Sequence, residues 1–126
     1  MNDPIGDALV WIGVVLLGGV GSVLRFALDK AVSVRTGRAF PYGTLVVNVS
    51  GALVLGFLTG LVLDERTALL AGTALVGSYT TFSTWMFETQ RLAEDRQVSR
   101  LAGNIVVSLV VGVGAAALGR FVGGAL

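Results

Sequence analysis

The sequence predicts an all-α integral membrane protein, because its composition, the length of its apolar segments and its short connections agree. Of 126 residues, 54% are hydrophobic and 13% are charged, and apolar residues gather in four segments at about 8–28, 42–63, 67–87 and 101–126. Each segment reaches the ~20 residues that a helix needs to cross a ~30 Å hydrocarbon core. The connections leave no room for a soluble domain. We expect one domain over residues 1–126, a lipid-embedded, multi-pass four-helix protein of the cell membrane.

The composition also excludes several classes of function. The chain has no cysteine and no histidine, which excludes disulfides, thiolate metal sites and histidine-based zinc binding or catalysis. No nucleophile–base pair is evident, so we expect a protein that is not an enzyme. The net charge of +1 gives no electrostatic reason to bind nucleic acid. The function is therefore expected to lie within the helical bundle.

Lys and Arg residues are distributed unevenly between the connections. Four spans place both termini on one side of the membrane, and the loops 29–41 and 91–100 on the other. Those two loops hold six Lys and Arg residues with Arg25 close by, whereas the terminal side holds only Arg66 and Arg120. Because cytoplasmic loops are enriched in Lys and Arg, the bias predicts cytoplasmic basic loops and external termini.

Two spans carry a polar or small residue at every fourth position. The second span has Thr44, Asn48, Ala52, Gly56 and Gly60, and the fourth has Asn104, Ser108, Gly112, Ala116 and Arg120. Residues four apart share a helix face, and small residues on such a face favour close helix packing. Asn48 has two interpretations. An amide within a span needs a partner and tends to be functional, but it can also serve structure alone.

The third span contains the most informative run of the chain, from Gly77 to Trp85. Asp64, just before this span, is placed to cap its helix. Irregular backbone at membrane depth is tolerated only where protein buries it or it lines a water-filled path. Gly77 permits dihedrals that break a helix, so we expect a break near the middle of this span, with freed carbonyls able to hold a cation. The run holds more hydroxyls than bonding back to the helix requires; they are Ser78, Thr80, Thr81, Ser83 and Thr84.

The polar groups within the spans suit a small, strongly hydrated anion. No span carries an acidic residue before Glu88, which is expected to reach toward the cytoplasmic interface. Amides and hydroxyls can replace the hydration shell of an anion, and the ring edges of Phe82 and Trp85 are positive. Arg25 is either interfacial or part of a vestibule that attracts anions. Composition does not identify the anion.

Three motifs resemble the Fluc (CrcB) fluoride channels in order and spacing over essentially the whole chain. They are Gly18-Gly19-x-Gly21-x-x-x-Arg25, Gly43-Thr44-Leu45-Val46-Val47-Asn48 with Gly51, and Gly77-x-x-Thr80-Thr81-Phe82-Ser83-Thr84 with Glu88. The resemblance implies an antiparallel dimer of four-helix subunits with two pores. Such a channel passes fluoride out of the cell passively and so reduces fluoride toxicity.

The resemblance also implies roles for individual residues. Asn48 matches the pore asparagine, Phe82 the first of two pore phenylalanines, and Ser108 a pore hydroxyl. The carbonyls of Gly77 and Thr80, from both subunits, match those that hold a buried structural sodium ion. Arg25 would lie at the vestibule. The full predicted fluoride pathway is Asn48, Phe82, Trp85, Thr81, Ser83, Asn104 and Ser108.

Three positions depart from the pattern of the family. Trp85 replaces the second phenylalanine, Ser78 replaces a glycine beside the sodium site, and Asn104 stands where some relatives have tyrosine. The uneven charge also matters, because a self-pairing antiparallel dimer inserts in both orientations and should have balanced loops. The chain is expected to form either a heterodimer with a related subunit or a dual-topology homodimer.

Two alternatives to a conducting subunit stand. The chain could be a non-conducting or partner-dependent subunit of a heteromeric fluoride channel. A small four-helix proton-coupled exporter is the other alternative, but such exporters rely on a glutamate in the first span, and residues 8–28 contain none.

Overall fold

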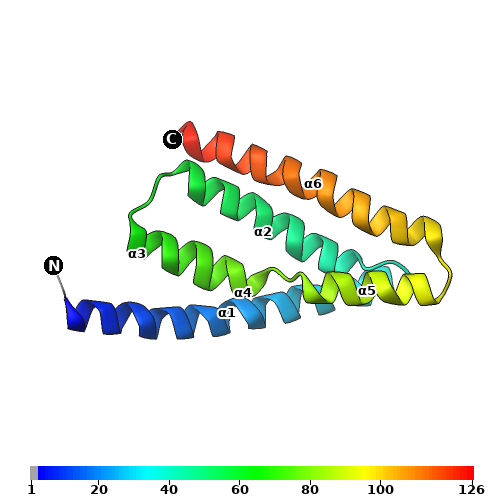
Figure 1. The fold of residues 1–126 in the computed structure, drawn as a ribbon, viewed down its shortest axis with the longest axis horizontal. Helices are drawn as coiled ribbons and strands as arrows, with labels where there is room; N and C mark the ends of the chain where they lie inside the picture. The colour runs from blue at the N-terminus through cyan, green and yellow to red at the C-terminus, as the bar shows by residue number, and fades with distance from the viewer. Residues whose placement is uncertain (1–2) are drawn as a thin grey trace.

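The protein is built from helices that form four rods lying side by side. The structure, a computed structural model, describes residues 3–126, and no strand occurs in that range. The sequence-based prediction of an all-α protein is confirmed. Figure 1 shows that α1 begins at the same end of the bundle at which α6 finishes. The elements are α1 (Pro4–Thr36), α2 (Tyr42–Gly60), α3 (Glu65–Ala68), η1 (Leu69–Val76), α4 (Gly77–Tyr79), α5 (Ser83–Glu94) and α6 (Val98–Gly124).

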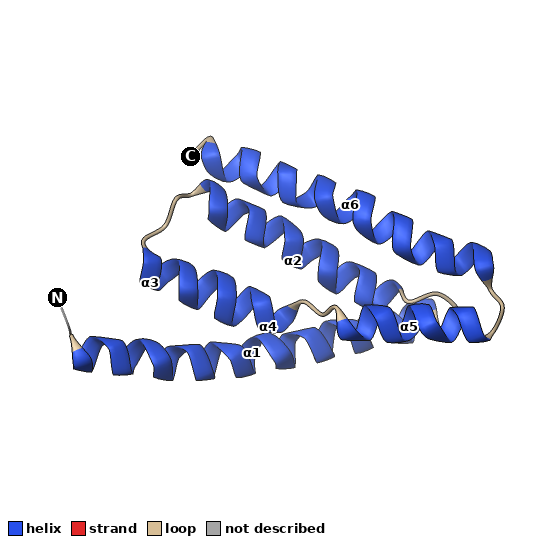
Figure 2. Ribbon diagram, viewed as in Figure 1, coloured by secondary structure: helices blue, strands red, loops and turns tan. Residues whose placement is uncertain are grey.

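Three of these helices, α1, α2 and α6, are long and apolar enough to cross a membrane. The third predicted span, residues 67–87, is instead divided among α3, η1, α4 and α5. Figure 2 shows these segments as one rod interrupted by a loop between α4 and α5. The η1 segment has π-helical hydrogen bonds, a rare arrangement that often occurs at functional sites.

Helix α1 extends beyond the apolar segment that predicted it at both ends, whereas α2 ends at Gly60, before the predicted bound of residue 63. Asp3 caps α1 by accepting a hydrogen bond from the Gly6 N–H at 3.1 Å, and the helix ends only at Gly37, whose φ is 75°. The predicted loop 29–41 is therefore shorter than expected. Hydropathy marks only the apolar segment, and a helix continues through polar residues until its backbone is stopped.

The other helix ends differ from the predicted bounds for the same reason. The α5 helix continues to Glu94 and α6 starts at Val98, so the predicted loop 91–100 is also shorter. The predicted cap at Asp64 is confirmed, since its side chain accepts a hydrogen bond from the Thr67 N–H at 3.1 Å. Hydrogen bonds from Thr67 hold the pKa of the Asp64 carboxyl below its usual value.

Close packing between α2 and α6 relies on the small residues that the sequence placed on one face of each helix. A Cβ atom on Gly56 would strike the backbone of Ala116, and one on Gly119 would strike the backbone of Leu53. Gly112, by contrast, faces open space. The packing interpretation is confirmed for Gly56, and the two backbones approach because these side chains are absent.

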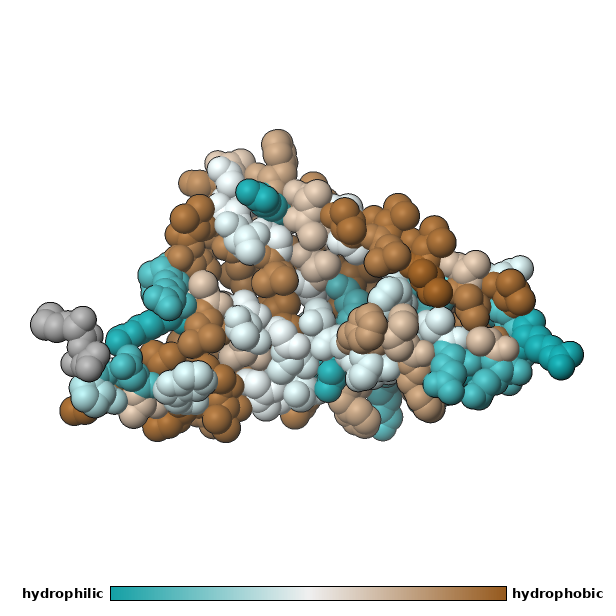
Figure 3. Space-filling view, in the orientation of Figure 1, coloured by the Kyte–Doolittle hydropathy of each residue, from teal (hydrophilic) through white to brown (hydrophobic). Residues whose placement is uncertain are grey.

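The outside of the bundle is apolar along its length. Trp11, Val15, Phe26 and Val110 each expose more than 60% of their surface, whereas few large apolar side chains are buried. Figure 3 shows polar residues at the two ends of the bundle and apolar residues along its sides. Such a surface is suited to lipid or to a second subunit rather than to water.

Candidate functional site

The backbone leaves the helical conformation at Thr80, in the middle of the rod formed by α3 to α5. Thr80 has φ −79° and ψ 159°, and regular helix resumes at Ser83. Gly77, where the sequence predicted the break, is helical, with φ −61° and ψ −38°. That detail of the prediction is wrong, because a glycine permits a break but does not supply the hydrogen bonds that a broken backbone needs.

Asn48 on α2 supplies those hydrogen bonds. Its Nδ2 donates to the carbonyl oxygen of Thr81, and its Oδ1 accepts from the N–H of the same residue, each at 2.8 Å. One side chain thereby satisfies both backbone groups of Thr81, as a neighbouring strand would. Within the chain, the amide has a structural role; its place on the fluoride pathway stays a prediction.

Two carbonyls lose their usual helical partners at this break. In a continuous helix, the N–H of Thr81 would bond to Gly77 and that of Thr84 to Thr80. Here the Thr81 N–H donates to Asn48, and the Thr84 N–H donates to the Thr81 Oγ1 at 3.2 Å. The diverted bonds leave the carbonyl of Gly77 without its helical partner, and the carbonyl of Thr80 accepts from Arg25 Nη1 at 3.4 Å instead.

The hydroxyls of the run lie around the start of α5. Thr81 Oγ1 donates to Thr84 Oγ1 at 3.2 Å and lies 3.5 Å from Ser83 Oγ. Ser78 and Thr80, on the other side of the break, bond back to helix carbonyls. The predicted cluster therefore divides into two hydroxyls that bond within their own helix and three that gather beyond the break.

The two aromatic residues of the run contact each other edge to face. The ring centroids of Phe82 and Trp85 lie 5.8 Å apart, with an interplanar angle of 79°. Phe82 is 70% exposed. The indole N–H of Trp85 donates to the carbonyl oxygen of Asn104 at 3.2 Å, which ties α5 to α6. Trp85 is thus anchored within the subunit, whereas Phe82 faces outward.

The predicted pathway residues on α6 are both held inside the bundle. Asn104 is 1% exposed, and its Nδ2 donates to the Thr89 hydroxyl at 2.9 Å. The Ser108 hydroxyl is buried without a hydrogen-bond partner among residues 3–126. Buried hydroxyls are almost always satisfied, so Ser108 has an unused donor.

Glu88 turns into the bundle, contrary to the expectation that it reaches toward the interface. The Thr44 hydroxyl donates to its Oε1 at 2.7 Å, while its Oε2 is buried without a partner in the described chain. Thr44 is 2% exposed. The sequence showed Thr44 and Asn48 on one face of α2, but it did not show that this face meets Glu88.

Arg25 lies beside a small cavity between α1, α2 and the break. Its Nη1 donates to the Thr80 carbonyl oxygen at 3.4 Å. The cavity, of about 190 Å³, is also lined by Asp29, Thr44 and Thr81. The guanidinium therefore points across to the broken backbone, where its positive charge borders a polar cavity.

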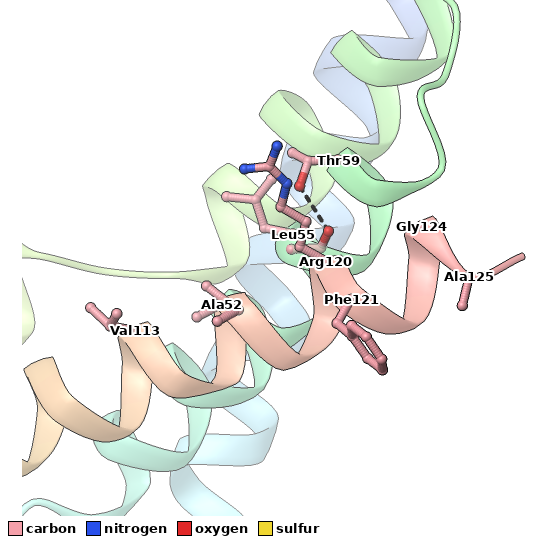
Figure 4. Close-up of a pocket in the computed structure, with 11 residues that line it drawn as sticks. Ala52, Leu55, Thr59, Val113, Arg120, Phe121, Gly124 and Ala125 are labelled. Carbon is pink, nitrogen blue, oxygen red and sulfur yellow. Dashed lines mark hydrogen bonds between the residues drawn. The ribbon is translucent and has the colours of Figure 1, made fainter.

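Two of the larger grooves on the surface of the subunit involve α2. One, of about 500 Å³, is lined by residues of α2 and of the third rod, including Gly77 and Thr80. The other, of about 900 Å³, lies between α2 and α6, and Figure 4 shows Thr59, Arg120 and Phe121 among its lining residues. The break is thus accessible from outside the subunit through the smaller groove.

Comparison with known proteins decides the family. A sequence model described as "CrcB-like protein, Camphor Resistance (CrcB)" matches residues 12–120. The chain belongs to the CrcB family. The match contains Arg25, Asn48, the break at Thr80 and Ser108. The chain is accordingly a multi-pass protein of the cell membrane, as its apolar helices predicted.

Relatives in this CrcB family extend over most of the chain. "Fluoride-specific ion channel FluC 2" of Mycobacterium tuberculosis H37Rv is 62% identical over 113 residues, covering 90% of both chains. The protein of that name from Mycolicibacterium paratuberculosis is 65% identical over 111 residues, 88% of this chain and 91% of the relative. "Fluoride-specific ion channel FluC 1" of Nocardia farcinica is 43% identical over 111 residues, which cover 87% of this chain and 78% of the relative.

Proposed function

We propose that this chain is a subunit of a fluoride-specific channel that lets fluoride leave the cell passively and so limits its toxicity. The observation that carries the proposal is the break at Thr80, which Asn48 stabilises and around which hydroxyls and aromatic rings gather. Relatives of the CrcB family named as fluoride-specific channels support the same conclusion.

The chemistry of the break favours an anion. The hydroxyls of Ser83 and Ser108 can each donate a hydrogen bond, Thr81 could do so by releasing its bond to Thr84, and the edge of Phe82 adds weak positive potential. Ser108 has no other partner in the described chain. With Trp85 and Asn104, these groups form the proposed pathway, and Arg25 would raise the local anion concentration at its mouth.

The subunit would work as an antiparallel dimer. Phe82 is 70% exposed, and the groove beside Gly77 and Thr80 is open, so the proposed pathway is unfinished in one subunit. A second subunit that covered both features would complete the pathway. An exposed apolar surface of this kind is typical of an interface within the membrane.

A structural sodium ion fits the carbonyls released at the break. Gly77 and Thr80 would each offer one oxygen, and rings of backbone carbonyls are a common way to hold alkali cations. The Thr80 oxygen accepts from Arg25 Nη1 in this structure, so sodium binding would require the guanidinium to move away from it. Two oxygens are too few for a cation, so the matching pair from the second subunit would complete the site. Bound there, sodium would hold the two breaks together and would not be transported.

The partner is proposed to be a related subunit of opposite orientation. Loops rich in Lys and Arg lie at one end of the bundle, which favours one fixed orientation. The relatives carry two numbered names, FluC 1 and FluC 2. A dual-topology homodimer is the alternative.

Fluoride efflux from liposomes tests the proposal. The purified chain is reconstituted alone and together with a FluC 1-type subunit, with Asn48→Asp as the control, and efflux is followed with a fluoride electrode. Efflux from the chain alone would favour a homodimer, and efflux only with the partner would favour a heterodimer. Folded, co-assembled protein that passes no fluoride in either preparation would refute a conducting function.

A further inference from the structure

The Lys and Arg residues at the two ends of the bundle differ in whether they have acidic partners. At the terminal end, Arg66 forms ion pairs with Asp3 at 3.8 Å and Asp7 at 3.0 Å. No other Lys or Arg makes an ion pair within residues 3–126. The unpaired charges are therefore concentrated at the opposite end, where the two basic loops lie.

Five of those unpaired residues are exposed, and we call four of them the basic rim: Lys30, Arg35, Arg96 and Arg100. Arg38 and Arg91 differ, because they face the acidic side chains of Asp29 and Glu88 around a small cavity. Arg91 also donates to the backbone oxygen of Arg38 at 3.0 Å. The basic rim is the part of this end whose charge is left for another molecule.

The α1 helix carries its share of the basic rim to the depth of the lipid headgroups. The helix has 33 residues, which corresponds to about 50 Å at 1.5 Å per residue, whereas the hydrocarbon core spans only ~30 Å. Its predicted apolar segment ends at Leu28, so the last two turns extend into the interface. Lys30 and Arg35 lie on those turns.

Lys30 also lies on the apolar face that α1 turns outward. Phe26, Lys30 and Val34 follow one another at four-residue spacing and so share one face. Phe26 is 69% exposed and Val34 is 76% exposed. A lysine on such a face lays its methylenes along apolar surface and directs its ammonium group to the interface.

The remaining part of the basic rim lies at the turn between α5 and α6. Arg96 and Arg100 are exposed there, and Arg100 is held by its hydrogen bond to Gln97 Oε1 at 2.7 Å. Two exposed acidic residues, Glu94 and Asp95, share this turn. The basic-rim residues on α1 therefore have fewer acidic neighbours than those at this turn. We expect the α1 residues to contribute most of the attraction for an anionic group.

We propose that the basic rim binds the phosphate headgroups of anionic phospholipids in the membrane leaflet on the side of the basic loops. Each Lys or Arg near the membrane surface should raise the affinity of the protein for anionic lipid about fivefold. The interaction would hold α1, and with it Arg25 beside the break, at a fixed depth. It is independent of whether the chain conducts fluoride.

Native mass spectrometry of the purified full-length chain in detergent tests the proposal, because orientation in a membrane then plays no part. The probes are phosphatidylglycerol and phosphatidylcholine with identical acyl chains. The wild-type chain should retain phosphatidylglycerol at least about fivefold better. Equal retention of the two lipids would overturn the proposal.

Variants locate the binding. Replacing Lys30 and Arg35 by glutamine should remove most of the preference, whereas the charge-preserving pair Lys30→Arg and Arg35→Lys should keep it. Arg66→Gln removes a charge that is already paired and should have no effect. A preference that survives in a folded Lys30→Gln/Arg35→Gln chain, or that excess inorganic phosphate abolishes entirely, would show that the basic rim is not a lipid headgroup site.

Discussion

Asn48 and Thr81 are joined by two hydrogen bonds of 2.8 Å, one in each direction, between a side-chain amide and a backbone peptide unit. The two residues are 33 positions apart in sequence, and their pairing connects α2 to the interrupted third rod. Lipid offers no substitute for such bonds. Both the fold and the proposed pathway therefore depend on this amide.

Replacing Asn48 with leucine should destabilise the subunit strongly. Leucine has a similar size but neither donates nor accepts hydrogen bonds, so both backbone groups of Thr81 lose their partner. Each unsatisfied group should lower the unfolding free energy by about 1–3 kcal/mol. Asn48→Asp keeps the acceptor and loses the donor, and it adds a negative charge that should stop fluoride. Thermal unfolding in detergent and liposome efflux measure the two effects. A leucine variant as stable as wild type would contradict this account of the break.

Phe82 and Trp85 should separate stability from conduction. Phe82 is 70% exposed and its ring contacts Trp85, so Phe82→Ala should lower the unfolding free energy of the subunit by no more than about 1.5 kcal/mol and yet reduce fluoride flux. Trp85→Phe keeps an aromatic ring but loses the hydrogen bond to Asn104. This loss should lower the unfolding free energy by about 1 kcal/mol. Unchanged flux in Phe82→Ala would remove Phe82 from the pathway.

Two glycines on α6 should respond in opposite ways to alanine. Gly119 meets the backbone of α2, so Gly119→Ala should force the helices apart and cost about 1–3 kcal/mol. Gly112 faces open space, so Gly112→Ala should be neutral in the isolated subunit or stabilise its helix by up to about 1 kcal/mol. Unfolding in detergent compares them directly, and equal effects would argue against close packing between α2 and α6.

Thr44 and Glu88 should be energetically coupled. The hydroxyl of Thr44 donates to a half-buried carboxylate, so Thr44→Val should cost about 1.5–3 kcal/mol, the range for a bond to a charged group. The same change should cost less in a Glu88→Gln background, whereas Thr44→Ser should be well tolerated. A double-mutant cycle of unfolding free energies measures the coupling, and a value near zero would mean that the contact contributes nothing.

Some features of the site were accessible from the sequence and others were not. Hydroxyl density singled out residues 77–85, and the four-residue spacing placed Thr44 and Asn48 on one face of α2. The inward turn of Glu88 was missed, because its position near the end of a span fits an interfacial residue equally well. The anchoring of Trp85 by Asn104 also went unpredicted, since the acceptor is a backbone carbonyl that no side-chain pattern reveals.

The sequence by itself determined that the chain is helical and membrane-embedded. The length of an apolar segment can be read from neighbouring residues alone, and about 20 such residues are what a helix needs to cross the hydrocarbon core. It also showed which residues carry the motifs of the CrcB family. Only the tertiary structure decided where the third rod breaks. Gly77 has the greater conformational freedom, but the backbone opens at Thr80, because the amide of Asn48 reaches Thr81 from another helix and replaces the hydrogen bonds that the break removes.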